Sequence, residues 1–178
     1  MITDSTCHLP PELIQRCGIH ALPMRLTLDG RACQDGVDLS ASDFCRQLPS
    51  LRHIPTTAAP SANVIEAAYR RAAGYNVAAI FLAASFSSLY HSALSVAREF
   101  SAAQSRSSRQ IAVTDSGQLS LGLGWQVLAA AASAAAGQSL VSVLAAVAAT
   151  RRRLKRPWYS SLHVSPFFRV QSSACILP

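Results

Sequence analysis

The sequence predicts an α/β domain built around a parallel β-sheet, and three observations support that fold class. Two continuous apolar runs bounded by turn residues, at 76–85 and 110–116, have the pattern of central parallel strands. A short apolar start at residues 1–5 adds a further strand. From residue 62 onward, segments with helical features alternate with the strands. Such an alternation is typical of a three-layer fold in which helices cover the faces of a parallel sheet.

The first fifty residues contain two predicted strands and two predicted helices. The strand at 1–5 runs into a turn, and the segment 9–18 begins with Pro and ends with Gly, as short helices do. Alternation over 19–30 predicts one strand that ends at an Asp-Gly turn. Residues 39–50 have Ser caps and an apolar face, and they predict a helix that stops before Pro49.

Four further helices are predicted in the second part of the chain. The helix over 62–74 is capped by Ser61 and has one apolar face. The helix over 87–103 begins with serines. The helix over 119–137 contains two early glycines that permit close packing, and the helix over 139–155 ends in positive charge, which its dipole favours.

The pattern of the chain changes after Arg156. We therefore predict an α/β domain over residues 1–156. The segment 157–178 mixes Pro, Ser and aromatic residues without a clear period, although "WYSSLHV" within it could form one strand. We interpret 157–178 as the start of a second domain or as an aberrant tail.

The net charge of +7 is concentrated near the C-terminal end of the 178-residue chain. Residues 1–100 are neutral overall, and Asp115 is the only acidic residue after them. Most of the excess lies in "RRRLKR" at 151–156. A nucleic-acid-binding surface spreads its basic groups over a face, so we expect a solvated helix end here and no nucleic-acid partner. A module that binds phosphate, RNA or a protein partner through this run is the alternative.

The cysteines and the N-terminus bear on cellular location. The five cysteines, at 7, 17, 33, 45 and 175, form no C-x-x-C pair and no metal-ligand spacing with His. We expect free thiols, no metal and a cytoplasmic protein. "MITDSTCHLP" has no signal-peptide features. The apolar stretch 127–149 is interrupted by "GQS", so we expect packed helices and no membrane span.

Hydroxyl-bearing residues gather at predicted strand ends and in loops. The segments concerned are "TDST" (3–6), "PTTAAPS" (55–61), "ASFSSLYHS" (84–92) and "TDS" (114–116). The carboxyl ends of parallel strands and the N-termini of helices are where α/β sheets bind ligands. Thr57 and Ser87 could therefore meet an anionic head group, and a carboxylate suits loops without Lys or a Gly-rich cradle better than a triphosphate does. Ordinary helix capping and an Asx-turn are the structural alternatives.

Motifs of enzymes and of nucleotide binding are absent from the sequence. It contains no G-x-S-x-G, no G-x-G-x-x-G and no P-loop. An enzyme with Ser87 or Cys7 as nucleophile is a rival interpretation, but neither residue has a base motif nearby. Cys7 and His8 are neighbours, whose side chains point apart on a strand. We therefore expect a binding protein without catalytic residues or a cofactor.

Five motifs in chain order resemble the DegV family of bacterial fatty-acid-binding proteins. They are "TDSTCHLP" (3–10), "QDGVDLSASDF" (34–44), "PTTAAPS" (55–61), "SSLYHSA" (87–93) and "DSGQLSLGLG" (115–124). No single one of these motifs is specific to the family, but the occurrence of all five in this order across residues 2–137 is specific. The chain is accordingly similar to the N-terminal α/β domain of that family.

The resemblance implies a function and a set of site residues. Family members hold one long-chain fatty acid, such as palmitate, with its carboxylate bound by hydroxyls and backbone N–H groups. The best-studied members present that carboxylate to a separate fatty acid kinase. Carried over by position, Thr56, Thr57, Ser87 and Ser88 would surround the carboxylate.

This sequence departs from the family pattern in two ways. Ala58 and Ala59 replace Ser-Gln, and Ser88 and Leu89 replace Gly-Thr, which removes polar groups and predicts weaker head-group binding. The family's second α/β domain, expected from about residue 157, is missing, and we interpret the chain as truncated or frameshifted. A non-functional fragment is therefore the alternative to a lipid-binding protein. The resemblance implies that the fatty acid tail lies in an apolar tunnel formed with the second domain. A homo-oligomer could cover the apolar surface that one domain alone would expose.

Overall fold

The computed structural model describes residues 1–72, 74–103 and 109–154. Within them, four strands form a parallel sheet in the order β2-β1-β6-β7, and three form an antiparallel sheet in the order β4-β3-β5. The strands of the parallel sheet are β1 (Ile2–Asp4), β2 (His20–Leu22), β6 (Val77–Phe81) and β7 (Ile111–Asp115). Those of the antiparallel sheet are β3 (Arg25–Leu28), β4 (Arg31–Gln34) and β5 (Thr56–Ala58).

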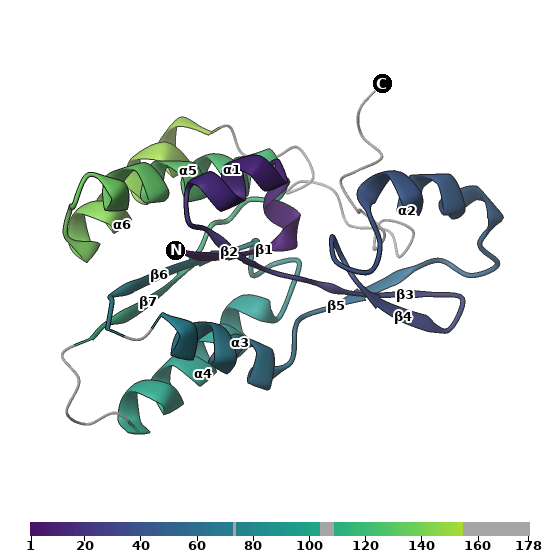
Figure 1. Ribbon diagram of the computed structural model, residues 1–178, viewed down its shortest axis with the longest axis horizontal. Coiled ribbons are helices and arrows are strands. Elements are labelled where there is room, and N and C mark those ends of the chain that lie inside the picture. Colours follow the sequence, from purple (N-terminus) through teal and green to yellow (C-terminus); the bar gives the residue numbers. More distant parts are fainter. Residues whose placement is uncertain (73, 104–108, 155–178) are drawn as a thin grey trace.

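The helices cover both faces of the parallel sheet, as the sequence predicts (Figure 1). On one face lie α1 (Pro11–Arg16), α5 (Leu121–Ala135) and α6 (Leu140–Arg153). On the other lie α3 (Ala62–Arg71) and α4 (Leu89–Ala103). The predicted α/β fold with a parallel sheet and helices on both sides is therefore confirmed. The segment 157–178 lies outside the described residues.

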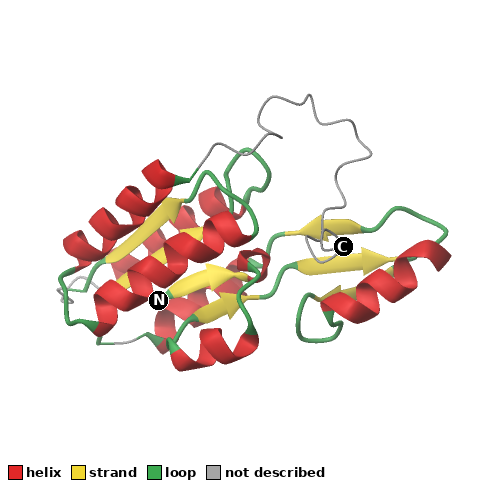
Figure 2. Cartoon of the chain, turned by 90° about the horizontal axis from the view of Figure 1, so that it is seen from above, coloured by secondary structure: helices red, strands yellow, loops and turns green. Residues whose placement is uncertain are grey.

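The antiparallel sheet forms a second, smaller unit beside the parallel one (Figure 2). Helix α2 (Ala41–Gln47) packs on it, and a 3₁₀ turn at Leu48–Ser50 follows. Its small core contains Leu26, Leu28, Cys33, Leu39 and Phe44. The prediction of a single strand over 19–30 is wrong: β2 and β3 belong to different sheets, and Pro23 lies between them. Proline lacks the N–H that a continuous strand would use, which explains the break.

The main core is formed by the central strand β6 and the helices above and below it. All five residues of β6 are buried, as predicted from their continuous apolar run. Strand β7 is only half-buried because it lies at the edge of the described sheet, so the prediction of a second fully buried strand is wrong.

Close packing of α5 depends on Gly124, one of the two early glycines noted in the sequence. A Cβ atom there would lie 2.5 Å from the backbone oxygen of Cys7 and 3.0 Å from a methyl carbon of Leu9. A Cβ atom at Gly122 would instead lie 2.8 Å from the side-chain oxygen of Gln118. Helix α5 therefore packs against backbone at Gly124 and against a side chain at Gly122.

We expect Gly124→Ala to destabilise the protein even though alanine favours helix. Overpacking costs about 1–3 kcal/mol, and helix propensity returns about 1 kcal/mol, so the free energy of unfolding should fall by up to about 2 kcal/mol. Gly122→Ala is the matched control, because a side chain can move aside where a backbone carbonyl cannot. Urea unfolding followed by circular dichroism measures both, and equal stabilities of the two variants would contradict the packing argument.

Candidate functional site

The buried carboxylate of Asp4 joins two loops at the carboxyl edge of the parallel sheet. Its Oδ1 accepts hydrogen bonds from the backbone N–H of Thr6 at 3.0 Å and from the Thr6 hydroxyl at 2.5 Å. Its Oδ2 accepts from the backbone N–H of Leu82 at 2.9 Å. Burial raises the pKa of Asp4 against the effect of these donors. The "TDST" segment is therefore an Asx-turn, as its structural alternative predicted, and it also anchors the loop after β6.

The loop after β6 is held from its other side by the loop after β7. The N–H of Ala84 donates to Oδ1 of Asp115 at 3.1 Å, and the N–H of Ala83 donates to the carbonyl of Gln118 at 2.9 Å. In return, the N–H of Ser116 donates to the carbonyl of Phe81 at 3.0 Å. Three loops after neighbouring strands are thus hydrogen-bonded into one edge.

Ser87 and Ser88 lie at the end of this loop, where α4 begins. The Ser87 hydroxyl oxygen accepts a hydrogen bond from the N–H of Leu89 at 3.1 Å, and its side chain is half-buried. Ser88 is exposed, and its carbonyl accepts from the N–H of Ser92. Ser87 therefore satisfies the first N–H of the helix, and its own hydroxyl proton is still available to an acceptor such as a carboxylate.

Thr56 and Thr57 lie on β5, a strand of the small antiparallel sheet. Both are exposed, and they pair in register with Thr27 and Leu26 of β3. The sequence identified the two threonines as candidate ligands without indicating that they form a strand. The sequence predicts them before a helix, and the structure adds that they lie on a strand of the antiparallel sheet.

Strand β5 leads directly into the N-terminus of α3. Ser61 is the N-cap, as predicted, but its side chain makes no capping hydrogen bond. Both candidate pairs thus precede helices that pack together on one face of the parallel sheet (Figure 1). In the part of the chain that the structure describes, no hydrogen bond directly joins Thr56 or Thr57 to Ser87 or Ser88.

His8 and Ser120 form a contact that sequence reasoning missed. Nδ1 of His8 lies 3.0 Å from Oγ of Ser120, and the two residues are 112 positions apart in the chain. Both have positive φ, 51° at His8 and 57° at Ser120, which is uncommon for residues other than glycine. Burial lowers the pKa of His8, while the negative charge of Asp35 opposes that effect. The sequence signal was "QLSLG", which differs from G-x-S-x-G only at its first residue, Gln118.

Cys7, one nucleophile of the rival enzyme interpretation, is unsuited to that role. Its side chain is buried, and burial raises the pKa of its thiol to about 11, so the thiolate is scarce at neutral pH. Cys7, Cys17 and Cys33 are free. Cys45 is disulfide-bonded, so the expectation of free thiols is wrong at that position.

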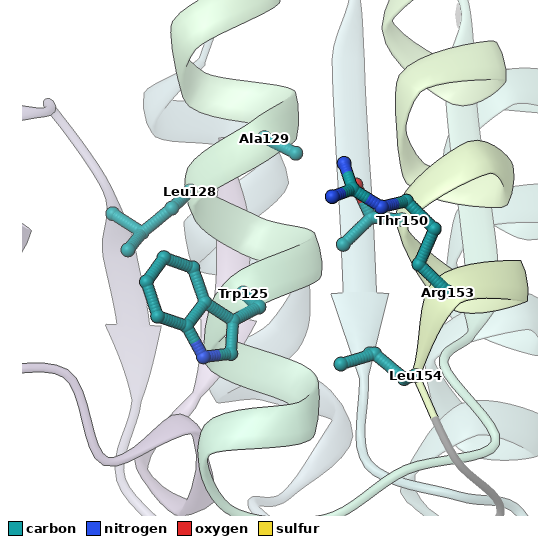
Figure 3. A pocket seen from close by; sticks show the side chains of 6 residues that line it. All are labelled: Trp125, Leu128, Ala129, Thr150, Arg153 and Leu154. Atoms are coloured by element: carbon teal, nitrogen blue, oxygen red, sulfur yellow. The ribbon is translucent and has the colours of Figure 1, made fainter.

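The arginines at the end of α6 are exposed, as predicted, and one of them also makes a hydrogen bond to the neighbouring strand. Arg151 donates from Nη1 to the carbonyl of Asp115 at 2.9 Å and lies directly over Gly117. Arg153 lines an open groove of about 580 Å³ between α5 and α6, with Trp125, Leu128, Ala129, Thr150 and Leu154 (Figure 3). Part of the basic run therefore fastens α6 to the loop after β7.

Two further expectations concern metals and membranes. Among the residues that the structure describes, no group of three or more His, Cys, Asp or Glu side chains could hold a metal ion. In the same ranges, none of the helices combines the length and the apolar character that crossing a bilayer requires.

Comparison with known protein sequences identifies one family. A family model described as "Uncharacterised protein, DegV family" matches residues 1–157. A DegV domain-containing protein of Mycobacterium bovis is 33% identical over 158 residues, which are 86% of this chain and 52% of that protein. A DegV domain-containing protein of Deinococcus radiodurans is 32% identical over 146 residues, 81% of this chain and 50% of that protein. The chain spans about half the length of these curated relatives.

Solved structures share the fold. A DegV family protein from Thermus thermophilus, described by its fatty acid binding, superimposes with a TM-score of 0.74 at 30% identity, over 85% of this chain and 52% of that chain. The DegV protein of Bacillus subtilis, described as a fatty acid binding protein, gives a TM-score of 0.75 at 21% identity, over 85% and 52% of the two chains. Both structures thus match this chain along most of its length.

Proposed function

This chain belongs to the DegV family, and from that premise we propose that it binds a long-chain fatty acid such as palmitate. The observation that carries the proposal is the likeness to the fatty-acid-binding Thermus thermophilus protein, at 30% identity over 85% of this chain. Because this chain covers about half of that protein, binding by this half alone is part of what we propose. No metal or cofactor takes part.

The proposed head-group site consists of Thr56, Thr57, Ser87 and Ser88. Their exposed or half-buried hydroxyls precede α3 and α4, whose N-termini carry partial positive charge and favour a carboxylate. The absence of a side-chain cap on α3 supports this assignment, since the first N–H groups of that helix then need another acceptor. Thr57 and Ser87 are the principal ligands in this proposal.

The departures from the family pattern have different consequences at different positions. Leu89 is fully buried in the main core, and Ala59 packs against the same core. Ala58 is exposed on the same face of β5 as Thr56, and Ser88 is exposed next to Ser87 in the chain. We therefore assign the weaker head-group binding to Ala58, where a polar side chain would have been able to reach a ligand.

We further propose that the protein presents the bound carboxylate to a separate fatty acid kinase in the cytoplasm. The family resemblance supports this role, and binding alone would not require catalytic groups at the head-group site. A second copy of the chain could cover apolar surface that this half of the fold leaves exposed.

The experiment that tests this function is lipid extraction with mass spectrometry, followed by titration with palmitate. We expect the purified protein to carry or take up one fatty acid per chain. Thr57→Ala with Ser87→Ala should weaken palmitate binding by about 10²-fold or more, because hydrogen bonds to a charged group contribute about 1.5–3 kcal/mol each.

Thr27→Ala with Ser95→Ala is the matched control for this double variant. It makes the same chemical changes at exposed positions of β3 and α4 and should leave the affinity unchanged. A protein that is empty and does not take up palmitate would refute the proposed function. Equal affinities of the two double variants would refute the assigned residues.

A further inference from the structure

Ser120 occupies a sharp turn between a strand and a helix, in a backbone conformation that most residues avoid. It is the N-cap of α5, reached by five residues from the end of β7, and its φ and ψ are 57° and −139°. Such a conformation costs about 1–3 kcal/mol and is found mainly at functional sites. The side chain makes no capping hydrogen bond. Its Oγ instead lies within hydrogen-bond distance of Nδ1 of His8, at 3.0 Å.

His8 is positioned for this contact by a strained backbone of its own. It has φ 51° and ψ 31° in the left-handed region, at the end of the 3₁₀ turn Ser5–Cys7. The side chains of two residues with positive φ, from distant segments of the chain, are therefore in contact. A serine that only caps a helix and a histidine that only faces solvent would need neither backbone conformation. A serine hydroxyl hydrogen-bonded to an imidazole is the arrangement of a nucleophile with its base.

The first turn of α5 supplies a donor for a developing negative charge. The N–H of Gly122 donates to the carbonyl of Leu119, and the N–H groups of Leu123 and Gly124 donate to that of Ser120. The N–H of Leu121 has no acceptor within the described part of the chain. In enzymes with a nucleophile turn of this kind, the N–H of the residue after the serine stabilises the oxyanion.

We propose that Ser120 and His8 are a nucleophile and base that react with activated esters or thioesters of apolar acyl groups. Apolar acyl groups are favoured because the exposed side chains beside the serine are Leu121 and Trp125, which lie four residues apart on the same face of α5. This activity is distinct from fatty-acid binding at Thr57 and Ser87 and does not require it.

The reaction proceeds in two balanced steps. Oγ of Ser120 attacks the acyl carbonyl carbon as Nδ1 of His8 takes the hydroxyl proton, and the N–H of Leu121 stabilises the oxyanion. The bond to the leaving alcohol or thiol then breaks, and His8 returns the proton to that group. Water attacks the acyl-serine by the same route, with His8 as base, and releases a carboxylic acid and the free Ser120 hydroxyl.

The test uses the full chain with p-nitrophenyl butyrate as ester and a fluorophosphonate as a covalent probe of the serine. We expect p-nitrophenol release, and a single adduct that peptide mass spectrometry places on Ser120. Ser120→Gly should abolish both signals while leaving the fold intact, because glycine adopts positive φ without strain. His8→Gln should slow both reactions by about 10²-fold or more, as expected for loss of a general base.

The control variant is Ser139→Ala, which removes the serine that caps α6 by an ordinary hydrogen bond to the N–H of Ser142. It should react like the unmodified protein. Absence of an adduct, an adduct that persists in Ser120→Gly, or an unchanged rate in His8→Gln would each overturn the proposal. None of these outcomes depends on whether the protein binds palmitate.

Discussion

Replacing Phe81 by alanine is expected to lower the free energy of unfolding by about 3–5 kcal/mol, the usual cost of removing a buried phenyl ring. Phe81 is the last residue of β6, the strand between β1 and β7, and none of its surface is exposed. Helices pack on both faces of this sheet, so the surrounding residues have little freedom to fill the cavity. Urea unfolding followed by circular dichroism measures the loss.

Tyr75→Ala is the matched control for this prediction. It removes an aromatic ring two residues before β6, from a side chain that is 75% exposed. The expected loss is below about 1 kcal/mol, as for most surface substitutions. If the two variants unfolded at the same urea concentration, Phe81 would not be part of the core that holds the site loops in place.

The parallel sheet was predictable because the apolar pattern of its central strand indicates burial on both faces. The run Val77–Phe81 has no polar face, and only a strand covered on both sides has that pattern. Its neighbour Ile111–Asp115 also begins with three apolar residues but is only half-buried. Whether a strand is central or at an edge depends on the order of strands in space, which the composition of one strand does not contain.

The small antiparallel sheet was not predictable for a different reason. Its strands contain three or four residues each, too few to establish a period, and all three residues of β5 are exposed. Their pairing depends on β3, which the sequence joins to β2 without a clear break except at Pro23. The hydroxyls of Thr56 and Thr57 could be recognised as candidate ligands, but not their place on a strand.

The parts of the candidate site that depend on residues adjacent in the sequence were predictable. Ser87 before α4 is such a case, since its hydrogen bond to the N–H of Leu89 is local. The contact between His8 and Ser120 depends on two backbone conformations and on a separation of 112 residues. Neither residue type indicates a positive φ, so the contact between His8 and Ser120 can be recognised only in the folded structure.

Replacing Asp4 by alanine is expected to lower the free energy of unfolding by about 2–4 kcal/mol, because it leaves buried donors without an acceptor. The loss is greatest at the N–H of Leu82, which has no solvent nearby to replace the carboxylate oxygen at 2.9 Å. Relief of the buried charge offsets part of the cost, since burial raises the pKa of Asp4. The same substitution should weaken palmitate binding, because it frees the loop that ends at Ser87.

Asp38→Ala distinguishes this effect from the general loss of a carboxylate. Asp38 is exposed and accepts one hydrogen bond, from the N–H of Gln34 at 2.8 Å, and water can replace it there. We expect a loss below about 1 kcal/mol for this control, since exposed hydrogen bonds contribute about that much. Equal stabilities of the two variants would mean that the Asp4 carboxylate does not hold the loops together. If Asp4→Ala lost stability but kept its palmitate affinity, the Asp4 carboxylate would anchor the loop without affecting head-group binding at Ser87.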